Sequence, residues 1–173
     1  MSNETIVLVG NPRPQSRTRT AAEQAAAWLA PRLGADGPTS TIDLADVASE
    51  LFAPERPAAS AALERVAQAG LLVVATPVYK ASYTGLLKAF LDLYGPAGLA
   101  GVRAVPLVVS AAPAHASAGD AHLRPLLVEL GAQVPARSVA LLESQLAEVP
   151  QVLEEWWAAG GADGLRVTEG AIA

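Results

Sequence analysis

Three arginines, Arg13, Arg17 and Arg19, fall within seven residues of the chain, where a helix is expected to begin. The start of a helix carries partial positive charge and amide groups without intrahelical partners, so acidic residues are usual in its first turn. Here the first acid is Glu23. Cations gathered at this end of a helix, in a chain of net charge −5, favour a bound anion.

Hydroxyl groups accompany these cations. Ser16, Thr18 and Thr20 alternate with the arginines and add hydrogen-bond donors. The Walker pattern GxxxxGK[ST] does not occur, and the dinucleotide pattern GxGxxG does not follow Gly10. We therefore expect a phosphate held by hydroxyls, arginine and helix amides. The alternative is that Ser16 only caps the helix and that the arginines are solvated.

A second polar stretch, residues 76–82 (TPVYKAS), lies between an apolar run at 71–75 and a helical apolar stripe at 83–94. The run predicts a strand buried on both faces, and the stripe predicts a helix. In open α/β sheets, ligands bind at the carboxyl ends of strands. Residues 76–82 are therefore a candidate ligand loop, although an ordinary strand-to-helix connection has the same pattern.

Strand-like and helix-like segments alternate along the whole chain. The expected strands are 5–10, 39–44, 71–75, 102–109 and 134–142, and the expected helices are 17–33, 61–69, 83–94, 121–130 and 146–157. This alternation predicts an α/β three-layer sandwich of the flavodoxin-like type, with a five-stranded parallel sheet in the order 2-1-3-4-5. Pro106 is unexpected inside a central strand. We expect one domain at 1–159 and a Gly-rich tail at 160–173.

That strand order brings the loops after the first and third strands side by side, and the loop at 110–119 should border the same crevice. The composition excludes several other kinds of site. The absence of cysteine excludes disulfides and thiolate chemistry, and two histidines argue against a metal site. The acidic charge and 5% aromatic content argue against nucleic-acid binding. No apolar run is long enough for a membrane span and no signal peptide is evident, so a cytoplasmic location is expected.

Both loops resemble those of a known family, the NAD(P)H-dependent FMN reductases. Gly10 to Arg13, followed by Ser16 and Thr18, resembles that family's G-S-x-R-x-x-S phosphate loop. Residues 76–82 and the following helix resemble its flavin-ring loop, and they are most similar to the branch that supplies reduced FMN to two-component sulfonate monooxygenases. The resemblance runs from about residue 6 to residue 142.

The resemblance implies FMN as cofactor, NADPH or NADH as hydride donor, and a homotetramer or homodimer. It implies that Tyr79 and Lys80 position the flavin ring, and that Ser110 and His115 border it from the loop at 110–119. His122 falls where relatives can carry an inserted interface residue. The implied FMN-binding residues are Asn11, Arg13, Ser16, Arg17, Thr18, Pro77, Val78, Tyr79, Lys80, Ser110 and His115.

Two departures from the family pattern bear on affinity. Asn11 stands where relatives usually have serine, and it keeps a hydrogen-bond donor. Residues 110–113 read SAAP where many relatives have glycines that let backbone amides approach the flavin. Added Cβ atoms and Pro113 restrict that approach, so FMN is expected to bind more loosely than in those relatives.

The expected reaction is hydride transfer from reduced nicotinamide to FMN N5, which requires no acid–base pair on the protein because the cofactors supply the reactivity. Backbone amides around residues 78–80 are expected near the ring edge. The reduced FMN would pass to a partner monooxygenase. Alternatives are a flavodoxin-like electron carrier, or a quinone or azo-type reductase with bound FMN. A carrier usually has aromatic walls on both ring faces, whereas Tyr79 is the one evident wall.

Overall fold

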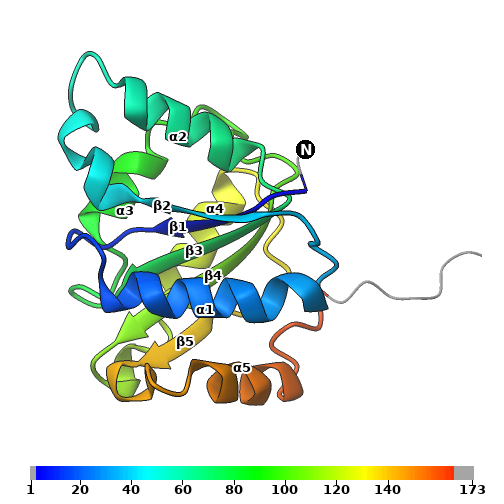
Figure 1. Ribbon diagram of the computed structural model, residues 1–173. Coiled ribbons are helices and arrows are strands. Elements are labelled where there is room, and N and C mark those ends of the chain that lie inside the picture. Colours follow the sequence, from blue (N-terminus) through cyan, green and yellow to red (C-terminus); the bar gives the residue numbers. More distant parts are fainter. Residues whose placement is uncertain (1–2, 166–173) are drawn as a thin grey trace, which may run out of the picture.

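The computed structural model describes residues 3–165. Its centre is one sheet of five parallel strands in the order β2-β1-β3-β4-β5, which confirms the predicted topology (Figure 1). The strands are β1 (Thr5–Val9), β2 (Thr39–Asp43), β3 (Leu71–Pro77), β4 (Arg103–Ser110) and β5 (Val139–Leu142).

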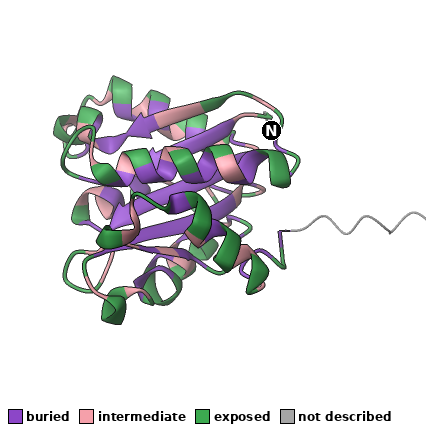
Figure 2. Ribbon diagram, turned by 60° about the horizontal axis from the view of Figure 1, so that its bottom comes forward, coloured by how far each residue is buried: buried purple, intermediate pink, exposed green. Residues whose placement is uncertain are grey.

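Helices cover both faces of the sheet. One face carries α1 (Arg17–Arg32) and α5 (Val149–Ala158), and the other carries α2 (Pro57–Ala67), α3 (Gly85–Leu91) and α4 (Arg124–Glu129). Successive strand residues point to opposite faces, so Val7 and Val9 pack toward α1 while Ile6 and Leu8 pack into the other layer. The central strands β1 and β3 are therefore buried at every position, and Figure 2 shows them between helices that are exposed on their outer sides.

Short helical segments lie in the connections. They are η1 (Leu44–Glu50), η2 (Pro113–His115), η3 (Gly119–Leu123) and η4 (Glu143–Gln145). The segment η3 is a π-helical turn that leads directly into α4 and contains the exposed His122. The predicted helix 121–130 is thus a wide turn followed by a short α-helix, with Pro125 in the first turn of α4 as expected.

Pro106 is tolerated in β4 because an N–H group at this position would point toward the β5 side of the strand, before the first residue of β5. The amide of Ala104 donates to Gln133 on the β5 side, and N–H groups of one strand alternate sides, so position 106 faces the same way. The ladder to β5 starts only at Leu107 with Val139. A central strand can therefore contain this proline without losing a sheet hydrogen bond.

Several element boundaries differ from the sequence expectation. Of the predicted strand 134–142, only the part from Val139 forms a strand, which begins after Pro135. Helix α2 begins earlier than expected and α5 later, and each has a proline, Pro57 and Pro150, in its first turn, where the missing amide costs nothing. Of the predicted tail 160–173, residues 160–165 are described, with Ala162 and Leu165 in the core, and the rest lies outside the described residues.

Within residues 3–165, no helix has both the length and the apolar character that crossing a membrane would require.

Candidate functional site

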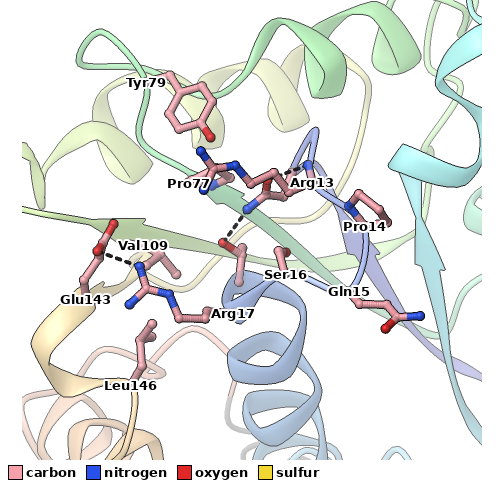
Figure 3. A pocket seen from close by; sticks show the side chains of 12 residues that line it. Arg13, Pro14, Gln15, Ser16, Arg17, Pro77, Tyr79, Val109, Glu143 and Leu146 are labelled. Atoms are coloured by element: carbon pink, nitrogen blue, oxygen red, sulfur yellow. Dashed lines mark hydrogen bonds and ion pairs between the residues drawn. The ribbon is translucent and has the colours of Figure 1, made fainter.

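A cleft of about 340 Å³ lies at the carboxyl edge of the sheet, between the first loop, the end of β3 and the segment after β5 (Figure 3). The topology explains its position, since β1 and β3 are neighbours and their loops leave the sheet together. The residues that line it are Asn11, Arg13, Pro14, Gln15, Ser16, Arg17, Thr18, Pro77, Tyr79, Val109, Glu143 and Leu146.

The buried side chain of Asn11 shapes the first loop. Its Oδ1 accepts a hydrogen bond from the backbone N–H of Arg13 at 2.9 Å, and its Nδ2 donates to Oγ1 of the buried Thr18 at 3.1 Å. One amide side chain therefore ties the loop to the first turn of α1. Because Thr18 Oγ1 accepts this bond, its own hydroxyl proton is left to donate elsewhere.

Ser16 caps α1, since its Oγ accepts from the backbone N–H of Arg19 at 3.3 Å. The amides of Arg17 and Thr18, at the first two helical positions, have no partner within the helix. The first turn contains no acidic residue. Ser16 does cap the helix, as the alternative reading held, and the helix start still presents unpaired amides and positive dipole charge toward the cleft.

The three arginines take different roles. Arg13 lines the cleft and forms no ion pair with any residue in the described part of the chain. Arg17 also lines the cleft, and its Nη2 lies 2.8 Å from Oε2 of Glu143. Arg19 turns away from the cleft, toward Glu23 at 2.9 Å and Asp43 at 3.7 Å, and the hydrogen bond to Glu23 raises the pKa of Arg19. Two of the three arginines, Arg13 and Arg17, therefore face the cleft.

The loop after β3 closes in a tight turn that presents Tyr79. The backbone groups of Tyr79 and Ser82 exchange hydrogen bonds of 2.8 and 3.1 Å, and Lys80 and Ala81 between them have φ values of 51° and 63°. Tyr79 is 45% exposed and lines the cleft. The amide of Val78 donates to the carbonyl of Val109 at 2.8 Å. The amides of Val78 and Tyr79 are therefore already used in hydrogen bonds within the protein.

The structure brings most of the predicted site residues together. Seven of them line the cleft: Asn11, Arg13, Ser16, Arg17, Thr18, Pro77 and Tyr79. Four others do not line it. Val78 packs against the core, Lys80 lies exposed at the tip of its turn, the buried Ser110 donates to the carbonyl of Ala112, and His115 is exposed in η2.

With this geometry in place, residues 4–146 match the model of a family described as NADPH-dependent FMN reductase. The chain belongs to this family. It is 38% identical over 146 residues to FMN reductase (NADPH) of Escherichia coli strain K12, an alignment that covers 83% of this chain and 75% of the relative. It is 36% identical over 126 residues to the NADH-dependent FMN reductase SfnF of Pseudomonas putida, covering 70% of this chain and 67% of the relative.

Solved structures agree with this assignment. The apo form of an NADH:FMN oxidoreductase, EMOB, superposes with a TM-score of 0.80 and 31% identity, over 99% of this chain and 92% of that one. An archaeal flavodoxin superposes with a TM-score of 0.58 at 14% identity, over 86% of this chain and 92% of that one, which shows the shared fold only. The predicted flavodoxin-like fold and family are confirmed, and the chain is an oxidoreductase of the FMN reductase family.

Five lining residues were missed by the sequence analysis: Pro14, Gln15, Val109, Glu143 and Leu146. The predicted topology contains a signal for three of them. Val109 is near the carboxyl end of β4, and Glu143 and Leu146 follow β5, so all three lie at the edge where the loops after β1 and β3 meet. The ends of β4 and β5 thus border the cleft together with those of β1 and β3.

Proposed function

We propose that the protein reduces FMN with NADPH or NADH, holding the FMN phosphate at the start of α1 and the flavin ring beside Pro77 and Tyr79. The observation that supports this proposal is the cleft at the carboxyl edge of the sheet, which joins two kinds of surface. Its first loop carries Arg13, Arg17 and a capped helix start, and its other side carries Tyr79 (Figure 3).

The residues at the start of α1 fit a phosphate. Two unpaired helix amides, the hydroxyls of Ser16 and Thr18, and the guanidinium of Arg13 all offer donors. Asn11 serves this group indirectly, because its two hydrogen bonds hold Arg13 and Thr18 in their places. A dianionic phosphate is the ligand that such a set of donors favours.

The opposite part of the cleft fits a planar ring. Pro77, Val109 and the face of Tyr79 are apolar or aromatic surfaces that exclude water from one side of the cleft. Bound FMN would supply the hydride-accepting chemistry, which asks of the protein only binding and orientation. Lys80, exposed at the tip of the same turn, would add positive charge near an anionic ligand.

The site also suggests that FMN is exchanged between turnovers. Tyr79 is half-exposed, and none of the residues 110–119 lines the cleft. A loosely held flavin suits a reductase that delivers reduced FMN to a partner monooxygenase. The proposal includes a cytoplasmic location and a homotetrameric or homodimeric assembly. In that assembly the exposed His122 would lie near a subunit contact.

The direct test is to mix the purified protein with NADPH or NADH and excess FMN, and to follow the nicotinamide absorbance band. Sustained oxidation with excess free FMN supports the reductase. A tightly flavin-loaded protein that does not turn over would instead indicate an electron carrier.

A binding experiment tests the phosphate site separately. Arg13→Ala and Ser16→Ala should weaken FMN far more than riboflavin, which has the same ring and no phosphate. Arg56→Ala, at the start of α2, is the matched control and should leave both ligands unaffected. Equal losses for FMN and riboflavin would show that the first loop does not hold the phosphate.

A further inference from the structure

One carboxylate, that of Glu143, forms an ion pair with an arginine of the cleft. Glu143 is the first residue of η4, immediately after β5, and its Oε2 lies 2.8 Å from Nη2 of Arg17. Figure 3 shows this pair at the side of the cleft formed by Leu146 and Val109, with Ser16 at the helix start beside it. Of the described residues that line the cleft, Glu143 is the single acid.

The position of this carboxylate is unusual for an anion-binding corner. Helix α1 has no acidic residue in its own first turn, so its positive end is left for an external anion. Glu143, 126 residues further along the chain, provides a negative charge there by bonding to the first helical residue. Without ligand, the guanidinium of Arg17 is therefore partly neutralised by a group of the protein itself.

We propose that Glu143 sets the affinity and the bound lifetime of FMN by competing with the flavin phosphate for Arg17. This inference rests on the proposed function and assigns to Glu143 a role in making FMN exchangeable. A phosphate that enters the corner meets the carboxylate as a like charge and must share or take over the guanidinium. The carboxylate thus lowers FMN affinity and favours release of the flavin.

The exposure of the pair makes such an exchange feasible. The side chains of Arg17 and Glu143 are 70% and 47% exposed, and ion pairs in water contribute little to stability. Arg17 can therefore turn from the carboxylate to a phosphate without disturbing the fold. A buried pair would instead hold the arginine in place and act as a fixed part of the protein.

The test is the affinity of Glu143→Gln for FMN and for riboflavin, measured by titration of flavin fluorescence. Glutamine keeps the size of the side chain and removes the charge. We expect the Kd for FMN to fall roughly three- to tenfold, with riboflavin unchanged, because only the phosphate interacts with the carboxylate. The rate of FMN dissociation, followed by stopped flow, should fall by a similar factor, and the KM for FMN should fall with it.

Glu154→Gln is the matched control. Glu154, an exposed residue of α5, pairs with Arg32 of α1 at 3.4 Å, just as Glu143 pairs with Arg17 of α1. Unlike Glu143, it does not line the cleft. Its replacement changes the net charge equally and should leave FMN affinity unchanged. Adding Glu143→Gln to Arg17→Ala should improve FMN binding less than Glu143→Gln improves it in the wild type, because without the arginine only the direct repulsion between carboxylate and phosphate is removed.

Two results would overturn this inference. FMN affinity of Glu143→Gln equal to that of the wild type would show that the carboxylate does not compete. Weaker FMN binding would show that Glu143 instead holds Arg17 in the binding position. Both results differ from failure of the proposed function, in which the wild type itself would neither bind FMN nor oxidise NADPH or NADH.

Discussion

The buried carboxylate of Asp43 accepts a hydrogen bond from the backbone N–H of Gln15, with 3.2 Å between Oδ2 and the nitrogen. Asp43 ends β2 and is 4% exposed, while Gln15 lies in the first loop with a φ of 50°. The same carboxylate accepts from the amide of Ala45 and lies 3.7 Å from Arg19. The end of β2 thus fixes the backbone of the loop that follows β1. It holds Gln15 in a left-handed conformation, which is unfavourable for a residue with a side chain.

Asp43→Asn should therefore loosen the first loop. The variant keeps the size of the side chain, but it loses the charge that faces Arg19 and one acceptor oxygen. We expect a stability loss of about 1–3 kcal/mol and FMN affinity reduced on the order of tenfold, with a smaller effect on riboflavin. Chemical denaturation and flavin titration measure the two effects. Asp46→Asn, at an exposed carboxylate in η1, is the control. Unchanged FMN affinity in Asp43→Asn would mean that the carboxylate does not set the shape of the loop.

Gly10 is required by a close approach of β1 to α3. A Cβ atom at Gly10 would lie 2.6 Å from the Cβ of Leu87, and the carbonyl of Gly10 accepts a hydrogen bond from Thr84, which caps α3. Gly10→Ala should destabilise the protein by about 1–3 kcal/mol, because the helix and the strand must separate. Thermal or chemical unfolding measures this loss.

Gly85→Ala provides the contrast. A Cβ atom at Gly85, the first residue of α3, would have no neighbour within 4 Å, and alanine favours helix more than glycine does. This variant should be neutral or slightly stabilising. If Gly10→Ala were equally harmless, close packing against Leu87 would not explain the glycine.

The sequence predicted the sheet order and most of the first loop because those features depend on local patterns. Continuous apolar runs predict the strands, and cations at a helix start predict an anion site. The partners of those cations could not be predicted in the same way. Arg19 is paired with Asp43 and Arg17 with Glu143, and both contacts join segments far apart in the chain.

The contribution of the segment 110–119 was less predictable because it depends on a side chain, Ser110, that turns inward. Ser110 looked like a ligand contact, but it is buried and bonds Ala112, so Val109 lines the cleft instead. Successive strand residues point to opposite faces of a sheet. An error of one residue in the expected end of β4 therefore exchanges the residue that faces the cleft with the one that faces away. Strand ends are the least certain part of a sequence prediction, and here that uncertainty fell on a site residue.

The turn that carries Tyr79 has two residues in the left-handed region, Lys80 and Ala81. Asparagine and glycine are favoured in such turns, whereas residues with a Cβ atom pay a conformational cost. Replacing Lys80 and Ala81 together by Asn and Gly should raise the free energy of unfolding by about 1–2 kcal/mol. Riboflavin affinity should not change, since Tyr79 keeps its bonds to Ser82. Absence of any gain in a denaturation experiment would contradict the presence of strain in this turn.

Tyr94 makes stability depend on alkaline pH. Its hydroxyl donates to the carbonyl of Leu63 at 2.9 Å, its ring packs edge-on to Phe90, and burial raises the pKa of Tyr94 above its ordinary value of 10.0. The folded state thus favours the neutral phenol. The stabilisation is complete below pH 10.0, where the phenol is neutral in both states, and it is lost as the pH rises from there through the folded pKa.

Tyr94→Phe separates the two contributions of this side chain. At neutral pH the variant should lose about 1 kcal/mol, because the carbonyl of Leu63 is left without its donor. Above pH 10 it should lose stability less steeply than the wild type, because no phenol remains to ionise on unfolding. Denaturation curves at pH 7 and above pH 10 measure both effects. Tyr79→Phe, which changes an exposed tyrosine, should follow the wild type at both pH values. If Tyr94→Phe showed the same alkaline loss as the wild type, ionisation elsewhere in the protein would have to account for it.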